Sequence, residues 1–562
     1  MIVFRKWLLG SLAAGWLSSV AVTFAQAQAD LPATPVAQLT RPAGWQLVGA
    51  VAAGPGSGSL KTQPGTTILT GTREPLTLLK PTDDFRMRFD VLMTANSDVL
   101  LTLPSGQPIS FAHSLDLPRL SKAPGLWQTV EVWYKMGGPK ENDILEKLVL
   151  NGVTVREGQI LSGRTANAVT LMDKNGTVAV RNVGSRTMMP RDVARWSGPV
   201  SYTIVEGGYI QDPAEAARKK VLKQDTTALL NYEVAYGQPR QYTLLFNGKL
   251  NALQAGEYQF DLNQGGVAAL WVDGKEVIPV SHRELGQSST GNVTLSAGPH
   301  DVKVYFSRSW FRPGLGLFVS QAGTRPQPLH ALASLPEPDP VGAISVQAKA
   351  RPELIRSFVQ VPGETKKRTH SLSVGTPAGM HYTLDLNQMA LLQVWKGDFA
   401  NATEMWYERG EPQLLSPLGV TVHLPAQTAL MTLNDENAAW PDSADENALQ
   451  YKGLMVDKDG MPTVEYGLAG ATVTETIRPE GNALVRTLAL KGEPRGTIYC
   501  RLAAGALEEV EKGVYAINDR RYYVRFDPKA KAKLRQVAGR QELLLPVVLK
   551  NGAGSVQYSI VF

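Results

Sequence analysis

The sequence predicts a mainly β fold, with tandem jelly-roll-like β-sandwich modules and a short helical connector. Three observations lead to this prediction. The chain has 562 residues, too many for one hydrophobic core, so several domains are expected. Its 52 glycines and 36 prolines supply many turn positions. Short runs rich in Val, Thr and Leu lie between those turns, as in sandwiches built from short strands.

The N-terminus has the three parts of a secretory signal peptide. Arg5 and Lys6 are positive, residues 7–24 carry no charge, and small residues follow at 25–29. Cleavage after Ala27 or Ala29 predicts an exported protein, periplasmic or extracellular. The alternative is a retained anchor, because the apolar segment is near the lower length limit for crossing a bilayer. No second long apolar run follows, so we expect no membrane span after cleavage.

Turn-rich and strand-like segments predict seven regions along the chain. They are a signal peptide (1–29), a linker (30–44), a first sandwich (45–189), a connector with a helix (190–230), a second sandwich (231–322), a Pro-rich linker (323–341) and a C-terminal β-rich domain (342–562). In the connector, Asp212 can cap a helix that begins at Pro213 and continues to residue 223. A further helix is considered over 529–537.

The first sandwich contains the clearest strand patterns. Residues 85–91 and 129–134 alternate apolar and polar side chains, as half-buried strands do. Two more short strands flank Asn151-Gly152, a pair typical of a tight hairpin turn. Residues 178–183 give the last strand of this module.

Charge and cysteine content exclude several classes of function. The formal net charge is +6, and removal of Arg5 and Lys6 leaves about +4, with no long basic run, so no nucleic-acid partner is expected. Cys500 is the only cysteine, which excludes an internal disulfide, a cysteine-based zinc site and a c-type haem motif. No His/Asp/Glu cluster has metal-ligand spacing, so we expect no metal and no cofactor.

Four motifs of the first sandwich occur in a characteristic order. They are residues 84–89 followed by Asn96-Ser97, residues 124–128, residues 150–152, and residues 171–176 followed by 180–183. In this order they resemble the "DFELRLEF" strand with its Asn-Ser, the "PGEWN" segment, the "LNG" hairpin and the "LQDHG…FRNI" ending of the 3-keto-disaccharide hydrolase-like domain family. The resemblance covers about residues 45–189. It implies a concanavalin-type sandwich that acts on a sugar.

The same resemblance implies a site. Asp173 and Arg181 match motif positions, and an arginine beside a carboxylate can orient sugar hydroxyls. Lys174 stands where the family has His, and Asn96 belongs to the Asn-Ser motif. His113 can act as an acid or base near neutral pH. We therefore take Asp173 and His113 as candidate catalytic residues, and Asn96, Arg181 and Lys174 as candidate substrate-binding residues.

Each candidate also has a structural alternative. Glycoside cleavage usually needs two carboxyl groups. The first sandwich offers Asp84, Asp90, Asp98, Asp116 and Asp173, but carboxylates are common at strand ends and turns. A protonated lysine at 174 is a poor base, so we expect weak or no hydrolysis of 3-keto-disaccharides.

The second sandwich resembles the carbohydrate-binding domain type first seen in anthrax protective antigen. The matching segments are residues 246–250, 255–260, 270–275, 295–302 and 314–317, in family order over about 232–321. Sugar-binding members of that family place two acidic residues before the "LWVDG" strand to hold calcium. Here Gln264-Gly265-Gly266 precedes it, so no tight calcium site is expected. A structural or protein-contact role follows for this module.

The C-terminal domain resembles no family that we can name. Trp395, Trp406, Tyr407 and Trp440 either line a sugar platform or belong to the core. Two hypotheses remain for the whole chain. It is an exported carbohydrate-active protein that acts on or binds a glycan, or a non-catalytic scaffold that holds a glycan or other extracytoplasmic proteins.

Overall fold

The computed structural model describes residues 31–114, 116–138, 141–163, 166–310, 312–338, 343–407, 413–445, 447–537 and 539–562. The predicted signal peptide lies outside these ranges. The described chain consists mostly of antiparallel strands with a few short helices, which confirms the predicted mainly β fold. No helix within the described ranges combines the length and the apolar character needed to cross a bilayer.

The described helices each contain three or four residues. They are η1 (Val36–Gln38), α2 (Leu117–Leu120), α3 (Pro213–Ala216), η2 (Tyr232–Ala235), η3 (Leu332–Ser334) and α4 (Thr403–Trp406).

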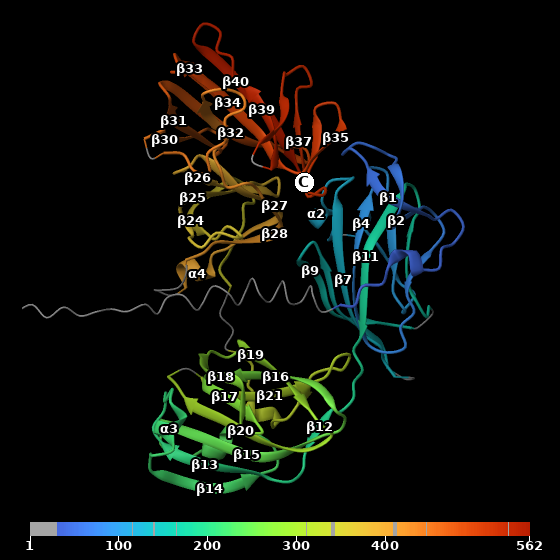
Figure 1. The fold of residues 1–562 in the computed structure, drawn as a ribbon, viewed down its shortest axis with the longest axis vertical. Helices are drawn as coiled ribbons and strands as arrows, with labels where there is room; N and C mark the ends of the chain where they lie inside the picture. The colour runs from blue at the N-terminus through green and yellow to red at the C-terminus, as the bar shows by residue number, and fades with distance from the viewer. Residues whose placement is uncertain are drawn as a thin grey trace, which may run out of the picture. The chain divides into compact units, whose positions relative to one another are not determined.

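The chain divides into two compact units. Unit 1 comprises residues 1–81, 86–185 and 342–562, and unit 2 comprises residues 82–85 and 186–341. Figure 1 draws the first sandwich of unit 1 in blue to cyan, unit 2 in green, and the C-terminal domain of unit 1 in yellow to red. Unit 2 is therefore inserted between the two parts of unit 1.

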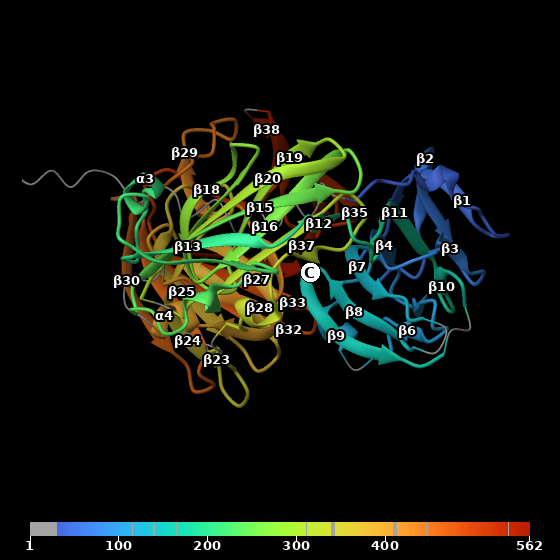
Figure 2. The same ribbon diagram turned by 90° about the horizontal axis from the view of Figure 1, so that it is seen from below.

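The first sandwich consists of two antiparallel sheets. Its larger sheet has the order β1 (Gln46–Ala52), β2 (Lys61–Gly71), β11 (Val178–Thr187), β4 (Phe85–Met93), β7 (Trp127–Lys135), β8 (Asp143–Leu150) and β9 (Val153–Leu161). The smaller has the order β3 (Leu76–Leu79), β10 (Val169–Asp173), β5 (Val99–Thr102) and β6 (Pro108–Ser110). Figure 2 shows β11, β4, β7, β8 and β9 side by side.

The local patterns of the first sandwich form the expected elements. Along β4, Phe85, Met87 and Phe89 are buried and the residues between them are partly exposed. Asn151 and Gly152 join β8 to β9 with φ values of 52° and 84°. Both residues are left-handed, as a two-residue hairpin turn that matches the strand twist requires. The predicted hairpin is therefore confirmed.

The C-terminal domain has three sheets. One has the order β23 (Ser345–Val346), β27 (Ala390–Asn401), β26 (Met380–Asp385), β25 (Arg368–Gly375) and β24 (Glu353–Val359), with β28 (Ser416–His423) also paired to β27. A second has the order β29 (Leu430–Leu433), β34 (Thr497–Gly505), β39 (Arg540–Pro546) and β38 (Lys533–Val537). The third has the order β30 (Leu449–Val456), β31 (Pro462–Leu468), β32 (Ala471–Glu480), β33 (Ala483–Gly492), β40 (Ala553–Val561), β37 (Tyr522–Phe526), β36 (Val514–Ile517) and β35 (Leu507–Glu511).

Side chains from all three of these sheets meet in one apolar core. Trp395 and Trp440 are buried, whereas Trp406 and Tyr407 are 53% and 54% exposed. Trp395 packs on Phe399 with parallel rings, as a core residue does. Residues 529–537 do not form a helix, because β38 pairs with β39 there.

Unit 2 is a sandwich of two sheets. Its larger sheet has the order β14 (Val221–Thr227), β13 (Val200–Glu206), β15 (Tyr242–Ala252), β20 (Gly298–Arg308), β17 (Gly266–Val272) and β18 (Lys275–Arg283), with β12 (Ala194–Trp196) also paired to β15. The smaller has the order β19 (Ser288–Leu295), β16 (Gly256–Gln264), β21 (Leu315–Ser320) and β22 (Gln327–Pro328). One apolar core lies between them.

The range 190–230 differs from the connector expected there. It contains β12, β13 and β14, which extend the larger sheet of unit 2. Asp212 does cap the helix, because its Oδ1 accepts a hydrogen bond of 2.9 Å from the backbone N–H of Ala214. The helix ends at Ala216, since the chain that follows pairs with β13 as β14. Pairing between distant strands thus overrides the local helical pattern.

Within unit 1, the first sandwich and the C-terminal domain pack against each other. A buried apolar cluster joins Ala123 and Leu126 of the first sandwich to C-terminal side chains that include Tyr523 and Val561. The Nζ of Lys396 donates to the backbone oxygen of Pro118, in the first turn of α2, at 3.3 Å. The contact is therefore apolar in one part and hydrogen-bonded in another.

Candidate functional site

Asp173 is fully buried at the end of β10. Its Oδ1 accepts three backbone hydrogen bonds, from Asp98 at 2.9 Å, Asn175 at 3.1 Å and Gly176 at 3.0 Å. These bonds close the loop after β10, in the way that aspartates stabilise turns. The other oxygen, Oδ2, is buried and has no hydrogen-bond partner among the described residues. Asp173 thus fixes the loop that carries Lys174.

Asp98 and His113 form a polar pair beside that loop. The Nδ1 of His113 lies 3.3 Å from Oδ1 of Asp98, and Ser110 donates a hydrogen bond of 2.7 Å to the same oxygen. The Asp98 side chain is 7% exposed, whereas the imidazole is 73% exposed. A buried carboxylate therefore lies beside an imidazole that solvent can reach, and Nδ1 of this imidazole is also 3.4 Å from Ser110 Oγ. The Nε2 of His113 has no partner among the described residues.

Lys174 borders the same pair, and Asn96 contacts the loop that carries Lys174. The Nζ of Lys174 lies 3.9 Å from Oδ2 of Asp98. The Nδ2 of Asn96 donates to the backbone oxygen of Asn175 at 3.3 Å. We call this set the Asp98 cluster and define it as Asn96, Asp98, Ser110, His113 and Lys174. It brings together three of the predicted site residues and lies directly against a fourth, Asp173.

Arg181 lies elsewhere in unit 1. Its Nη1 and Nη2 donate to the two carboxylate oxygens of Asp519, at 3.0 and 2.6 Å. The guanidinium stacks 4.0 Å from the Trp127 ring centroid, and its Nε lies 3.5 Å from Oδ2 of Asp90. No contact joins it to the Asp98 cluster among the described residues. The fifth predicted site residue therefore binds the C-terminal domain instead.

The loop that carries Asp519 has an unusual backbone. Asn518, Asp519 and Arg520 have φ values of 48°, 56° and 60°, three left-handed residues in a row. Such residues cost free energy and persist where the surroundings fix them. Here the Arg520 guanidinium donates to the backbone oxygen of Ala53 at 3.1 Å and to Glu508 at 2.6 Å. The loop is held in place from both sides of the domain contact.

The Pro124–Gln128 segment, one of the four motifs, lies at the same contact. The Tyr523 hydroxyl donates to the backbone oxygens of Ala53 at 2.8 Å and Pro124 at 3.1 Å. Gly125 has a φ of 77°, and a Cβ there would lie 2.2 Å from the Tyr523 hydroxyl. Leu126 belongs to the apolar cluster of the contact. In this chain the motif is thus part of a docking surface.

Two basic groups near Arg521 have lowered pKa values. Burial lowers the pKa of Lys122 to about 8; the Arg521 cation adds to this effect and Asp90 opposes it. The Lys122 Nζ donates to the backbone oxygen of Trp127 at 3.0 Å. Burial, with a smaller effect of Arg521, also lowers the pKa of His423. Burial and the Arg521 cation therefore disfavour the charged forms of both Lys122 and His423.

A hollow of about 680 Å³ lies on the larger sheet of unit 2. Its charged side chains already have partners. Lys249 pairs with Asp301 at 2.8 Å, and the Nζ of Lys303 lies 5.3 Å from the Trp271 ring centroid.

Sequence reasoning considered Asp98 only as one of five carboxylates, and it did not consider Ser110 or Asp519. The signal for Asp98 was its position directly after Asn96-Ser97. No local pattern marked Asp519, because its partner lies 338 residues away.

No family model matches the sequence, and no curated protein matches it. Among solved structures, the chain is similar to a β-glucosidase of Kluyveromyces marxianus, with 12% identity, 22% of this chain and 14% of that chain covered, and a TM-score of 0.18. It is also similar to an anti-sigma factor domain-containing protein of Clostridium clariflavum, with 10% identity, 49% and 87% covered, and a TM-score of 0.21. A third is an epithelial adhesin domain of Candida glabrata in complex with Galβ1-4GlcNAc, with 10% identity, 28% and 96% covered, and a TM-score of 0.18. At such TM-scores these likenesses carry no argument about function.

Proposed function

We propose that this chain is an exported carbohydrate-active protein, periplasmic or extracellular, that engages a glycan at the Asp98 cluster. The observation that carries the proposal is the pair in which the buried carboxylate of Asp98 lies 3.3 Å from the exposed imidazole of His113. Such an imidazole accepts or donates a proton near neutral pH. Lys174 adds a cation beside Asp98, and Asn96 adds an amide on the loop that carries Lys174; both groups bind sugar oxygens.

The substrate class proposed is a 3-keto-disaccharide, which the motif resemblance of the first sandwich implies. In such a sugar the carbonyl at C3 acidifies the C–H bond at C2. Nε2 of His113 takes this proton, and the C–H electron pair forms an enolate whose negative oxygen the Lys174 ammonium stabilises. The enolate then re-forms the carbonyl, a double bond forms between C1 and C2, and the glycosidic oxygen leaves C1 with its bonding pair. The imidazolium returns the proton to that oxygen.

Turnover of a 3-keto-disaccharide by the full-length protein tests this proposal. Because the family has His where this chain has Lys174, we expect slow turnover by the wild type. In His113→Ala the turnover rate should be at least tenfold lower than in the wild type. Lys147→Ala is the matched control, since Lys147 belongs to the same sandwich and pairs on its surface with Glu157 at 3.4 Å. Turnover that survives His113→Ala, or no turnover in the wild type, contradicts a catalytic role.

A second candidate function is a non-catalytic scaffold. The observation that favours it is the engagement of Arg181 by Asp519, which takes a predicted sugar-binding residue into the domain contact. If the first sandwich is only a scaffold, the wild type shows no turnover, and Asp519→Ala changes stability without creating turnover.

A further inference from the structure

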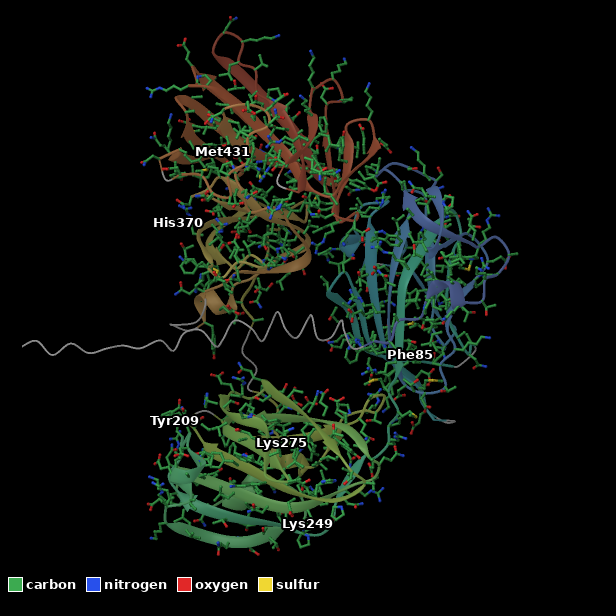
Figure 3. The ribbon with its side chains drawn as sticks, viewed as in Figure 1. Phe85, Tyr209, Lys249, Lys275, His370 and Met431 are labelled. Atoms are coloured by element: carbon green, nitrogen blue, oxygen red, sulfur yellow. The ribbon has the colours of Figure 1, made fainter. Side chains whose placement is uncertain are left out.

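A small pocket lies where the three sheets of the C-terminal domain meet. It is lined from β27, β33, β34, β37 and β40 and from the loop between β28 and β29. Its volume is about 50 Å³, roughly four times the smallest space that holds one water. All lining residues are buried except Pro425, which is exposed, and Gln427, which is partly exposed, so solvent reaches the pocket at this loop. Figure 3 labels Met431, the second residue of β29 after the loop.

Two tyrosines line the pocket from paired strands. Val524 of β37 pairs with Ile560 of β40, and Tyr522 and Tyr558 stand two residues from them on the same face. Tyr522 is 3% exposed, and its hydroxyl makes no hydrogen bond among the described residues. The Tyr558 hydroxyl accepts from Nη1 of Arg486 at 3.1 Å and donates to no described acceptor. Because buried hydroxyls are nearly always hydrogen-bonded, both indicate a ligand with acceptor atoms.

Both hydroxyls keep their protons at neutral pH. Burial raises the pKa of Tyr558 to about 12, and burial also raises the pKa of Tyr522. The two groups therefore present O–H donors to the pocket.

The buried charges around the pocket have an excess of positive charge. Five side chains that are at most 7% exposed carry them: Arg486, Arg501, Arg535, Glu475 and Glu542. Glu475 pairs with Arg486 at 2.8 Å, whereas Glu542 is shared between Arg501 at 2.8 Å and Arg535 at 2.5 Å. Burial lowers the pKa of Arg501, and Glu542 opposes this effect only in part. An anion in the pocket is therefore stabilised by the lining guanidiniums of Arg486 and Arg501.

An irregularity in β34 shapes the pocket. The register of β34 against β39 shifts between Arg501 and Ala503, which leaves Leu502 without a partner in β39. Successive residues of a regular strand face opposite sides of a sheet. Here Arg501, Leu502, Ala503 and Ala504 all line the same pocket. Bulges of this kind often lie next to functional sites, where they redirect a side chain.

We propose that this pocket binds the carboxylate group of an organic acid. The carboxylate oxygens accept hydrogen bonds from the Tyr522 and Tyr558 hydroxyls, and the Arg501 guanidinium supplies the opposite charge. Val524 and Ile560 give an apolar wall for the carbon part of the acid, which an inorganic anion such as chloride does not need. The volume suits a carboxylate with its first carbons, and the rest of a larger acid extends toward the loop between β28 and β29.

The test titrates the full-length protein calorimetrically with acetate, propionate, glucuronate, acetamide and chloride. At least one carboxylate should bind, with a Kd at least tenfold lower than that of acetamide, the neutral counterpart of acetate, and of chloride. Binding of acetate or propionate alone identifies a free small acid as the ligand, whereas binding of glucuronate identifies the acid group of a larger molecule. No binding of any carboxylate, or equal binding of acetamide or chloride, overturns the proposal and leaves the pocket to ordered water.

A tyrosine variant separates binding from folding. Tyr522→Phe removes the hydroxyl and keeps the ring. Because this hydroxyl has no described protein partner, the Tm of the ligand-free protein should not fall, whereas the Kd of the carboxylate should rise about fivefold, the loss of one hydrogen bond. Tyr451→Phe is the matched control, since Tyr451 belongs to the same domain and is 45% exposed; it should change neither quantity. An unchanged Kd in Tyr522→Phe contradicts binding at this pocket, whatever the Tm.

This site lies in the C-terminal domain and does not rest on the proposed function of the Asp98 cluster. His113→Ala should leave carboxylate binding unchanged, and Tyr522→Phe should leave turnover of a 3-keto-disaccharide unchanged. The two proposals can therefore fail independently.

Discussion

The carboxylate of Asp519 binds both terminal nitrogens of Arg181, in a bidentate pair between the C-terminal domain and the first sandwich. Arg181 is 19% exposed at its side chain and Asp519 is 67% exposed. A planar guanidinium suits a carboxylate in this arrangement, and its stacking on Trp127 limits its freedom before the pair forms.

The Arg181–Asp519 pair should stabilise unit 1 by about 1 kcal/mol, since partly exposed bidentate pairs are worth more than freely exposed ones. A double-mutant cycle with Arg181→Ala and Asp519→Ala, read by urea unfolding, measures the coupling. The same cycle for Lys147 and Glu157, an exposed pair of the first sandwich, should give a value near zero. Equal couplings in the two cycles would contradict the special role of the domain contact.

Gly125→Ala should destabilise unit 1 strongly, by about 3 kcal/mol or more, because it combines a left-handed backbone with a steric clash. A Cβ at Gly125 would lie 2.2 Å from the Tyr523 hydroxyl. Gly158→Ala is the control: Gly158 also has a positive φ, of 63°, but its Cβ would meet nothing within 4 Å. It should cost only about 1 kcal/mol, the left-handed penalty alone. Similar losses in the two variants would rule out the clash.

Stability should depend on Lys122 at alkaline pH. Its pKa is lowered to about 8 in the folded protein, from an ordinary value of 10.5. Between these values the unfolded chain binds more protons, so the folded state gains stability as pH rises from about 8 to 10.5. The difference in unfolding free energy between wild type and Lys122→Met should therefore shift in favour of the wild type over this range. Chemical unfolding of both proteins at pH 7.5, 9 and 10 measures this difference in free energy. A difference that is the same at all three pH values would contradict the prediction.

The pKa of His300 in unit 2 should make stability depend on pH in the opposite direction, so that stability falls as pH rises. The 2.6 Å hydrogen bond to Asp273 raises the pKa of His300, and it lowers the pKa of Asp273. The stabilisation from His300 is complete below its unfolded pKa and is lost as pH rises through the raised folded pKa; that from Asp273 is lost as pH falls through its lowered pKa. Asp273→Asn keeps a residue that tolerates the left-handed turn.

Asp273→Asn should therefore cost up to about 1 kcal/mol at pH 5.5, where both members of the pair are charged, and less at pH 8.5. Unfolding curves at the two pH values compare the losses. An equal loss at both would mean that the charge of His300 contributes nothing.

Calcium should not bind tightly to unit 2. The Gln264 amide is buried and donates to the backbone oxygen of Ser281, and the residues after it are glycines, whereas calcium prefers several carboxylate oxygens. Calorimetric titration of the full-length protein with calcium should give no tight isotherm. A submicromolar Kd that Gln264→Ala abolishes is the contrary result.

Local sequence patterns predicted those elements that local chemistry decides. The Asn151-Gly152 hairpin and the Asp212 cap depend on residues only a few positions apart, and both formed as expected. The strands of 190–230 were not predicted, because β12 and β13 form by pairing with β15, which lies outside this segment. The extent of a helix or strand is thus decided by partners elsewhere in the chain.

The candidate site follows the same division. Motif order placed Asn96 near the loop of Asp173 and Lys174, since β5 and β10 pair with Asp173 opposite Val99. The position of Arg181 could not be predicted, because its partner Asp519 belongs to another domain. His113 joins the cluster because its Nδ1 lies beside the carboxylate of Asp98. The backbone N–H of Asp98 in turn donates to Oδ1 of Asp173.

The insertion of unit 2 inside unit 1 also sets an order of assembly. Arg181 is synthesised 338 residues ahead of Asp519, and Leu126 precedes most of its apolar neighbours by more than 350 residues. The docking surface of the first sandwich therefore stays open to water while unit 2 and most of the C-terminal domain are still being synthesised. Contacts between such distant residues form slowly, because a long loop must close first. The nascent chain thus exposes an apolar patch until its C-terminal domain is complete, and a chaperone that binds apolar surface would bind there.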